Sequence, residues 1–422
     1  MLQPPMKSIE SQTSWVVAGV SVVLLGLSFG APWIMVVALK HVAAEAGGAR
    51  SGPSLAVSLA WFGSGVGGIA MGRIADKLGV RSTVIFGATM IAAGLAVSTF
   101  GPGWPLYLGH GLFIGLIGLA GLNAPLYIYV SRWFDRRRGS ALALISSGTY
   151  VAGALWPPVF ERSIAAFGWR ATMLGYGLAA AAAIVTLALL FLRPAPEDPL
   201  AAPAGAARVA KAGAVLGWPP NLVFGMLAAA IFMCCVTMSM PQSHLVAFCS
   251  DLGISATHGA AMLSLLLGTA FVSRQIWGLI SDRIGGLHTV IICSACQAAA
   301  MTAFLVTQGE GALFIVSAAF GLGFSGLIPA YVLATRELFP SAEASWRIPV
   351  ILLCSGSGMA TGGWLAGFLY DRFGFYGPSF ATGIAFNLAN FAVVAILVAR
   401  LHMGSARAGA AGSAGTLPPL GR

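Results

Sequence analysis

Charged side chains are scarce in this sequence. Lysine, arginine, aspartate and glutamate make up only 9% of its 422 residues, whereas hydrophobic residues make up 58%. A water-soluble protein of this length needs far more polar side chains to cover its surface. A large soluble helical protein would also need amphipathic stripes with charged outer faces. The composition therefore predicts a protein that lies in lipid.

Patterns that would indicate chemistry are also missing. The six cysteines lie in or near apolar stretches, without histidine or carboxylate neighbours at metal-ligand spacing, so we interpret them as small core residues. The chain offers no nucleophile with a base and an orienting group, and no phosphate-binding loop. We therefore expect neither an enzyme nor a bound metal or cofactor.

What the sequence has in abundance is long apolar runs. A helix that crosses a bilayer needs roughly 20 apolar residues. Twelve such stretches begin near residues 15, 53, 82, 105, 140, 170, 219, 257, 287, 312, 346 and 376. The segment before the first of them has no small-residue cleavage site, so we expect that helix to be retained. The fold class predicted is an all-α membrane protein with twelve transmembrane helices.

Basic residues are distributed unequally between alternate loops. Seventeen of the 23 lysines and arginines fall on the side of the N-terminus, and five fall on the opposite side. Because cytoplasmic loops carry the excess of basic residues, we expect both termini in the cytoplasm and a multi-pass protein of the cell inner membrane. Anionic lipid explains the net charge of +10, so nucleic-acid binding is not expected, nor is an obligate protein partner.

The chain divides into two parts of similar size. Residues 194–216 are rich in alanine, proline and glycine, so we expect a cytoplasmic linker between six spans in residues 1–193 and six in residues 217–401. Residues 402–422 are predicted to form a short flexible tail.

An internal repeat supports this division. The sequence GRIADKLGVR at Gly72–Arg81 recurs as GLISDRIGG at Gly278–Gly286, 206 residues later. The same offset, without a gap, aligns Glu45 with Asp251. The chain is therefore predicted to be a duplication.

The first copy of the repeat follows the pattern G-x-x-x-D-[RK]-x-G-x-[RK]. It resembles the signature of the major facilitator superfamily, which implies two pseudo-symmetric six-helix halves around one substrate site. We expect a gate at which carboxylates pair with basic residues and separate when the halves rock apart. The alternative is a helix-end turn with solvated charges. The predicted gating residues are Gly72, Asp76, Lys77, Arg81, Asp282 and Arg283.

A second stretch indicates the branch of the superfamily. Residues Ser131–Gly153, which open the fifth span, are similar to the corresponding segment of monocarboxylate transporters and oxalate:formate antiporters. Those families show an aromatic pair, two arginines and then small residues. The matching positions are Arg136, Arg137, Arg138, Ala141, Ser147, Gly148 and Gly153.

One arginine lies inside a predicted span. Arg274 is eight residues before Asp282, about 12 Å along a helix. An arginine in lipid costs at least about 2.5 kcal/mol and needs a partner or a wet cavity. A structural ion pair is the alternative, but no acid lies in the middle of a predicted span. Because guanidinium matches a carboxylate bidentately, we expect Arg274 to bind an organic anion, and the resemblance implies a monocarboxylate.

Two positions depart from the animal monocarboxylate transporters. Ala270 stands where they have an aspartate four residues before the arginine, and Trp33 follows Pro32 where many have a lysine. If transport is coupled to protons, another group must titrate. Asp251, Glu45 and His244 are the available candidates, and Asp251 is the first choice. Glu45 and Asp251 can also be read as helix-end residues kept by duplication.

Polar residues of the fourth and tenth spans are candidates for the cavity wall. Asn123 and Tyr127 are spaced i, i+4 and share one helix face. Tyr331 aligns roughly with Tyr127 in the duplicated half. All three can instead be packing or membrane-interface residues.

The function expected is secondary transport of short monocarboxylates such as L-lactate and pyruvate, together with a proton, by alternating access. An exchanger of the oxalate:formate type is the first alternative. Such exchangers carry a lysine in the eleventh span, where this chain has Cys354, Ser355 and Gly356. A membrane sensor is the second alternative, and it should carry an extended cytoplasmic domain.

Overall fold

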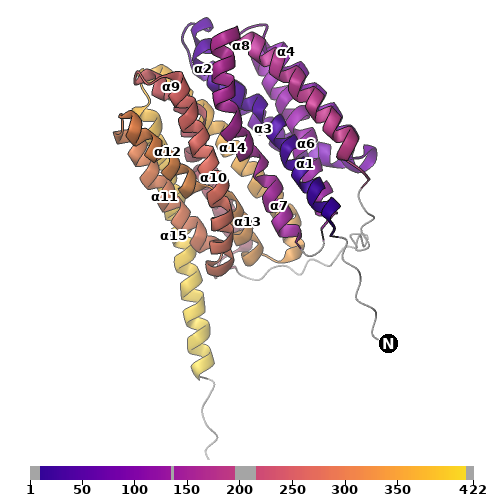
Figure 1. Cartoon of the computed structure of the whole chain (residues 1–422). Coiled ribbons are helices and arrows are strands. Elements are labelled where there is room, and N and C mark those ends of the chain that lie inside the picture. The colour runs from indigo at the N-terminus through magenta and orange to yellow at the C-terminus, as the bar shows by residue number, and fades with distance from the viewer. Residues whose placement is uncertain (1–9, 135–136, 195–214, 415–422) are drawn as a thin grey trace, which may run out of the picture.

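The computed structural model describes residues 10–134, 137–194 and 215–414, which form a bundle of long helices running side by side (Figure 1). The helices of the first half are α1 Gln12–Ser28, α2 Gly30–Glu45, α3 Ser51–Leu78, α4 Val80–Ser98, α5 Trp104–Tyr107, the π-helix η1 Leu108–Leu119, α6 Ala120–Ser131, α7 Arg138–Ser146 and α8 Gly148–Phe191. Those of the second half are α9 Pro220–Asp251, α10 Ala256–Ile284, α11 Gly286–Val306, α12 Glu310–Phe324, α13 Leu327–Leu338, α14 Ser341–Phe373 and α15 Gly377–Ala414.

Eleven helical segments of the described chain are long and apolar enough to cross a membrane. One of them, Ser140–Phe191, has 52 residues, which at about 1.5 Å per residue is more than twice the thickness of a bilayer core. It turns back at Gly168, whose φ of 78° and ψ of 161° interrupt the helix. Counting both arms gives twelve crossings, so the all-helical membrane fold is confirmed.

The flanks of the bundle are apolar, as lipid requires. Leu178 is 70% exposed and Ile315 is 72% exposed, although both side chains are large and hydrophobic. Exposure of such side chains is unfavourable in water but carries no penalty among apolar lipid tails. The polar side chains discussed below therefore lie inside the bundle or at its ends.

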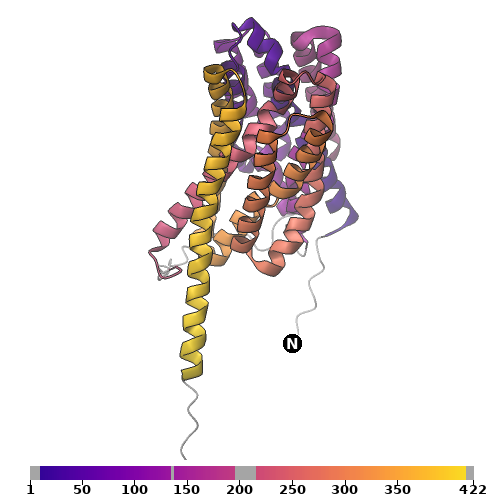
Figure 2. The same cartoon turned by 90° about the vertical axis from the view of Figure 1, so that its left-hand side faces the viewer.

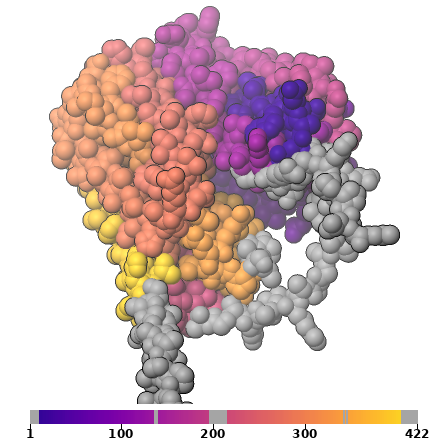
Figure 3. Space-filling view, turned by 60° about the horizontal axis from the view of Figure 1, so that its bottom comes forward, coloured from indigo at the N-terminus to yellow at the C-terminus, as the bar shows by residue number. Residues whose placement is uncertain are grey.

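The two halves gather on opposite sides of the molecule (Figures 1 and 3). They meet chiefly where α3 packs against α14 and where α8 packs against α10. These two contacts join elements far apart in the sequence, so they form the interface between the halves. The division at residues 193 and 217 stays a prediction, because most of the linker lies outside the described residues.

The predicted flexible tail needs a correction. Helix α15 does not end near residue 401 but continues to Ala414 and extends well beyond the bundle (Figure 2). Alanine-rich sequence after Leu401 favours this continuation, because alanine has the highest intrinsic helix propensity. Residues 415–422 lie outside the described chain.

The bundle has two chemically different ends. We call the end that carries Gly72–Arg81 the motif end; α1 begins there and α15 leaves the bundle there (Figure 1). We call the opposite end, where α2 is followed by α3, the Arg50 end. The central site described below lies between these ends.

Glycines allow α3 to touch η1 closely. A Cβ atom on Gly67 would lie 2.0 Å from the carbonyl oxygen of Leu116, and one on Gly115 would lie 2.7 Å from the backbone of Ala60. No side chain fits at such distances, so these positions hold the two helices together by backbone contact.

We predict that Gly67→Ala destabilises the protein by about 1–3 kcal/mol, the usual cost of overpacking. Gly225→Ala is the matched control, because no atom lies within 4 Å of a Cβ placed there. Thermal unfolding of the purified protein in detergent measures the difference. Equal melting temperatures for the two variants would contradict the close contact between α3 and η1.

Candidate functional site

A cavity of about 150 Å³ lies between the two halves. Water takes about 30 Å³ per molecule in the liquid, so the cavity has room for roughly five waters or one small solute. Each half contributes six lining residues. They are Trp33, Trp61, Tyr127, Ser146, Thr149 and Tyr150 from the first half, and Met238, Gln242, Leu267, Arg274, Ile328 and Met359 from the second.

Arg274 is the charged residue among those that line this cavity. It lies ten residues before the end of α10 at Ile284, about 15 Å along the helix and therefore near the middle of a bilayer core. Its guanidinium carbon is 5.1 Å from the centre of the Tyr150 ring, a cation–π contact between the halves. No acidic side chain of the described chain pairs with it. The positive charge of Arg274 is thus left without a protein counter-ion.

Two further donors in the cavity wall lack acceptors. Trp33 on α2 is 3% exposed and Gln242 on α9 is 4% exposed. Within the part of the chain that the structure describes, neither Trp33 Nε1 nor Gln242 Nε2 has a hydrogen-bond partner. Buried donors without acceptors are unfavourable and rare in folded proteins. A ligand that brings acceptor oxygens would satisfy them.

The packing around Trp33 explains why residue 153, one of the positions that match the monocarboxylate-transporter segment, is a glycine. A Cβ on Gly153 would lie 3.0 Å from the Trp33 ring and 2.2 Å from Leu267. Gly153 therefore leaves the space that the indole occupies. A cavity with one fixed cation, spare N–H donors and apolar or aromatic walls is chemically suited to a small organic anion.

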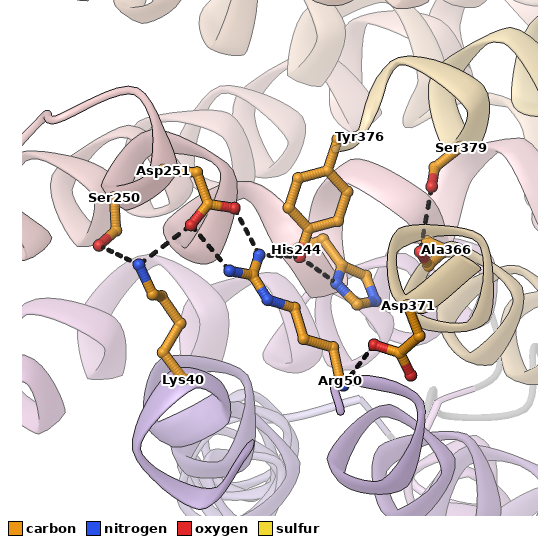
Figure 4. Close-up of polar contacts among 9 residues, drawn as sticks. All are labelled: Lys40, Arg50, His244, Ser250, Asp251, Ala366, Asp371, Tyr376 and Ser379. Atoms are coloured by element: carbon orange, nitrogen blue, oxygen red, sulfur yellow. Dashed lines mark hydrogen bonds and ion pairs between the residues drawn. The ribbon is translucent and has the colours of Figure 1, made fainter. Parts of the chain in front are cut away.

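At the Arg50 end, polar contacts join the two halves (Figure 4). The Arg50 guanidinium donates to both carboxylate oxygens of Asp251, with Nη1–Oδ2 at 2.6 Å and Nη2–Oδ1 at 2.7 Å. Lys40 Nζ donates to Asp251 Oδ1 at 3.0 Å and to Ser250 Oγ at 2.9 Å. Lys40 and Arg50 come from the first half, whereas Ser250 and Asp251 end α9 in the second. These bonds therefore join the two halves at this end of the bundle.

A second acid holds the same end together through backbone atoms. Asp371 of α14 accepts from the Arg50 N–H at 2.7 Å and from the Ser51 N–H at 2.9 Å. These two amides lie at the N-terminus of α3, where free N–H groups and the helix dipole favour a negative charge. The carboxylate of one half therefore caps a helix of the other.

His244 lies beneath this cluster and is completely buried. Its Nδ1 is 2.9 Å from the Tyr376 hydroxyl and its Nε2 is 2.8 Å from the Gly363 carbonyl oxygen. Tyr376 also accepts from Arg50 Nη1 at 2.8 Å. Burial alone would lower the pKa of Arg50, but its bonds to Asp251 and Tyr376 outweigh this effect and the pKa is raised. Arg50 therefore stays charged across the physiological pH range.

The equivalent acid of the first half is paired differently. Glu45 accepts from Arg170 Nη1 at 2.7 Å and Nη2 at 2.6 Å, and from Trp169 Nε1 at 2.9 Å. Both partners belong to the first half. At the 206-residue offset, the sequence FGWR at residues 167–170 becomes FGFY at residues 373–376, and Gly168 and Gly374 have φ of 78° and 80°. Tyr376 thus replaces Arg170, and Asp251 takes its cations from the other half.

The structure brings together only some of the predicted cavity residues. Arg274 and Tyr127 line the cavity, whereas Asn123 is half-buried on α6 and is not among the lining residues. Tyr331 is completely buried in the second half, where its hydroxyl donates to Asn390 Oδ1. The rough alignment of Tyr331 with Tyr127 did not account for this buried partner, so a cavity role for Tyr331 needs correction.

The predicted proton-coupling residues lie away from Arg274. The cations bonded to Asp251 are Arg50 and Lys40, and not Arg274. Glu45 sits in its own ion pair with Arg170. His244 is linked to Arg50 through the Tyr376 hydroxyl and through Ser54, whose hydroxyl is 3.3 Å from His244 Nε2 and donates to the Arg50 carbonyl oxygen.

Within the part of the chain that the structure describes, the predicted gating residues form no hydrogen bond or ion pair between the halves. Asp76 accepts from Arg132 Nη2 at 2.8 Å and Arg81 Nε donates to the Leu192 carbonyl at 2.9 Å, both within the first half. Gly72 is buried, and Lys77, Asp282 and Arg283 are exposed. The described bonds between charged groups of the two halves therefore lie at the Arg50 end and not at the motif end.

Sequence reasoning missed most of the cavity wall. Trp33 was noted only as a departure from a lysine, and Thr149 and Tyr150 lie inside the stretch of the resemblance without having been singled out. Spacing from Arg274 could have identified Leu267, which is seven residues away on the same helix face. Gln242 could have been predicted most readily as a cavity residue, because it is a polar side chain inside an apolar span.

Comparison with known proteins decides the family. The pattern of the family described as Major Facilitator Superfamily matches residues 18–286. The chain belongs to this superfamily. Its members are transporters and not enzymes, and the chain is therefore a multi-pass secondary transporter of some small solute.

Relatives and solved structures agree with this assignment. Bovine "Monocarboxylate transporter 13" is 26% identical over 82% of this chain and 79% of its own length. Mouse "Monocarboxylate transporter 11" is 25% identical over 92% and 88%. A crystal structure of a nucleoside transporter superposes with a TM-score of 0.70 at 12% identity, over 91% of this chain and 99% of that one. At such identity the structural likeness shows the fold alone.

We predict that Tyr331→Phe lowers stability and leaves substrate affinity unchanged. The substitution removes the donor to a buried Asn390 oxygen, at a cost of about 1–3 kcal/mol. Thermal unfolding measures the first effect, and the KM of transport measures the second. A raised KM with unchanged stability would instead return Tyr331 to the substrate site.

Proposed function

We propose that this superfamily member is a proton-coupled symporter of short monocarboxylates such as L-lactate and pyruvate. The observation that carries the proposal is the unpaired guanidinium of Arg274 in a central cavity of about 150 Å³. A charge in that position is stable only with a counter-ion or water beside it. A single small carboxylate supplies the missing negative charge in the bidentate geometry that arginine favours.

The cavity also supports a small substrate over a large one. Pockets for drug-sized ligands measure roughly 300–1,000 Å³, well above this volume. Aromatic walls from Trp33, Trp61 and Tyr150 suit the apolar end of a short acid. The distant similarity to monocarboxylate transporters 11 and 13 points to the same substrate class.

The contacts between the halves indicate which conformational state of an alternating-access cycle this structure represents. The bonds of Arg50 and Lys40 to Asp251 close one end, and the motif end carries most of the basic residues expected on the cytoplasmic side. We therefore propose that the structure is closed toward the outside of the cell, with both termini in the cytoplasm. Outward opening must break the cluster at the Arg50 end.

Proton coupling is proposed to involve Asp251 before Glu45 or His244. Symport with a proton makes the transported unit neutral, so the membrane potential does not oppose entry of an anion. Asp251 loses both of its cations when the halves separate, whereas Glu45 keeps Arg170. A carboxylate whose neighbours change with the state is the group that can couple a proton to movement.

An exchanger of the oxalate:formate type is less well supported. Such a protein adds a second central cation, and the cavity has Arg274 as its charged residue among the lining side chains. Cys354 is half-buried in the eleventh crossing and lies outside that lining. One guanidinium matches one carboxylate and not two.

We predict that purified protein in proteoliposomes accumulates labelled L-lactate when an inward proton gradient is imposed. Arg274→Lys should lower uptake at least tenfold, because it keeps the charge but loses the bidentate fork, a change worth about 1.5–3 kcal/mol. Arg170→Lys is the matched control, since Arg170 makes a similar pair with Glu45 outside the cavity.

The same vesicles separate the competing outcomes. Accumulation abolished by a protonophore supports symport, whereas uptake that requires an internal anion supports exchange. Uptake that survives in Arg274→Lys at the wild-type rate would refute the proposed substrate site.

We also predict that Trp33→Phe raises the KM for L-lactate about three- to tenfold, because the ring remains but the N–H donor is lost. Trp61→Phe is the control. Its ring lines the same cavity and stacks on Phe29 at 5.5 Å, and its indole nitrogen is not among the buried unpaired donors. Initial rates of uptake give both KM values. Equal changes in the two variants would show that Trp33 contributes bulk and not a hydrogen bond.

A further inference from the structure

The carboxylate of Asp251 sits in a site built by the other half of the protein. Arg50 presents both terminal nitrogens to it, and Lys40 adds a third donor. The guanidinium carbon of Arg50 lies 3.6 Å from the centre of the Tyr370 ring, which fixes its plane. Arg50 is 6% exposed, Asp251 23% and Lys40 39%, so the site is sheltered but lies at the edge of the solvent.

This arrangement has the chemistry of a monocarboxylate-binding site. A side-chain carboxylate and a free short carboxylate carry the same head group, and a planar fork with an added ammonium binds either one. Asp251 is therefore a tethered occupant of a site that a free acid of the same charge also fits. The site lies at the Arg50 end, away from the central cavity and its Arg274.

The duplication shows that this arrangement is peculiar to one half. Glu45 aligns with Asp251 but is bonded to Arg170 of its own half. Residue 376, which aligns with Arg170, is a tyrosine. Separation of the halves leaves the Glu45 pair intact and removes both cations from Asp251. The loss of both cations favours the neutral, protonated form of a carboxylate.

The other titratable groups around Asp251 are already engaged. Asp371 of α14 is occupied by the backbone amides of Arg50 and Ser51. His244 of α9 is bonded to Tyr376 and Gly363. Tyr370 lies under Arg50, and burial raises the pKa of Tyr376, which stays neutral. Asp251 is the carboxylate of this cluster that holds side-chain cations.

We infer that Lys40 and Arg50 form a carboxylate-binding subsite at the entrance, filled by Asp251 in this state and by the transported anion once the Arg50 end opens and Asp251 is protonated. The inference rests on the proposed function. The proton comes from water at that end and binds one carboxylate oxygen of Asp251. When Asp251 regains its cations, the proton passes to the water enclosed with the anion between the halves and leaves with the anion at the motif end. Protonation neutralises Asp251, which then no longer occupies Lys40 and Arg50, and the anion can bind these two cations. Proton and anion therefore bind to the opened end together.

Uptake of L-lactate by intact cells tests this subsite when the external pH is varied. In the wild-type chain the KM should fall as the external pH falls. In Asp251→Asn the cations are free at every pH, so the KM should be low and nearly independent of pH. Glu45→Gln is the matched control, since its position is equivalent by duplication, and it should keep the wild-type pH dependence.

A second variant covers the case in which Asp251→Asn does not reach the membrane. Arg50→Lys keeps the charge but loses the fork, so its KM should rise about tenfold, while Arg170→Lys should leave the KM unchanged. Wild-type pH dependence in Asp251→Asn, or an unchanged KM in Arg50→Lys, would overturn the subsite alone. Absence of proton-driven uptake in the wild-type chain would refute the proposed function and the subsite with it.

Discussion

A positive charge fixed in the middle of the membrane without a protein counter-ion is the constraint on which the rest of this structure depends. Arg274 cannot lose its proton and has no acid beside it among the described residues. The fold places it in a cavity between the halves, over Tyr150 and near two buried donors that lack acceptors. In the proposed function a small anion supplies the counter-charge for Arg274 and the acceptors for the two donors, which makes these groups the source of affinity. Alternating access, as proposed, requires a substrate site where the two halves meet, and the cavity lies there.

The duplication accounts for the two halves, and its departure from symmetry accounts for the bonds that join them at the Arg50 end. Both halves carry an acid before their second crossing and a tight turn after their fifth. In the first half Glu45 and Arg170 neutralise each other locally. In the second half Tyr376 occupies the position of that arginine, and Asp251 binds Arg50 and Lys40 across the interface. The ion pair within the first half thus has, in the second half, a bond between the halves in its place. Asp371, which caps α3 from the opposite half, strengthens the same closure.

Sequence alone predicted the architecture well, because each crossing is a local apolar run and its length is set by the bilayer. Arg274 could also be predicted, since an arginine in such a run is costly wherever it points. The pairing of Asp251 with Arg50 could not, because these residues are 201 positions apart and meet only when the halves pack. The unpaired donors of Trp33 and Gln242 could not be predicted either. Whether a donor has an acceptor depends on how the helices pack in three dimensions, which residue spacing in the sequence does not reveal. Tyr331 was predicted to line the cavity from its alignment with Tyr127, but its hydroxyl donates to the buried Asn390, a partner that the alignment does not indicate. The helical continuation after Leu401 was missed because short alanine- and glycine-rich segments resemble linkers.

The most direct test of the central claim is equilibrium binding of labelled L-lactate to the purified protein in detergent, without any gradient. The account predicts saturable binding of one molecule per chain, displaced by pyruvate and abolished in Arg274→Gln, with thermal stability rising as the ligand supplies the missing charge. Binding of equal strength in wild-type protein and Arg274→Gln would contradict it, because the anion would then be held by some other part of the molecule.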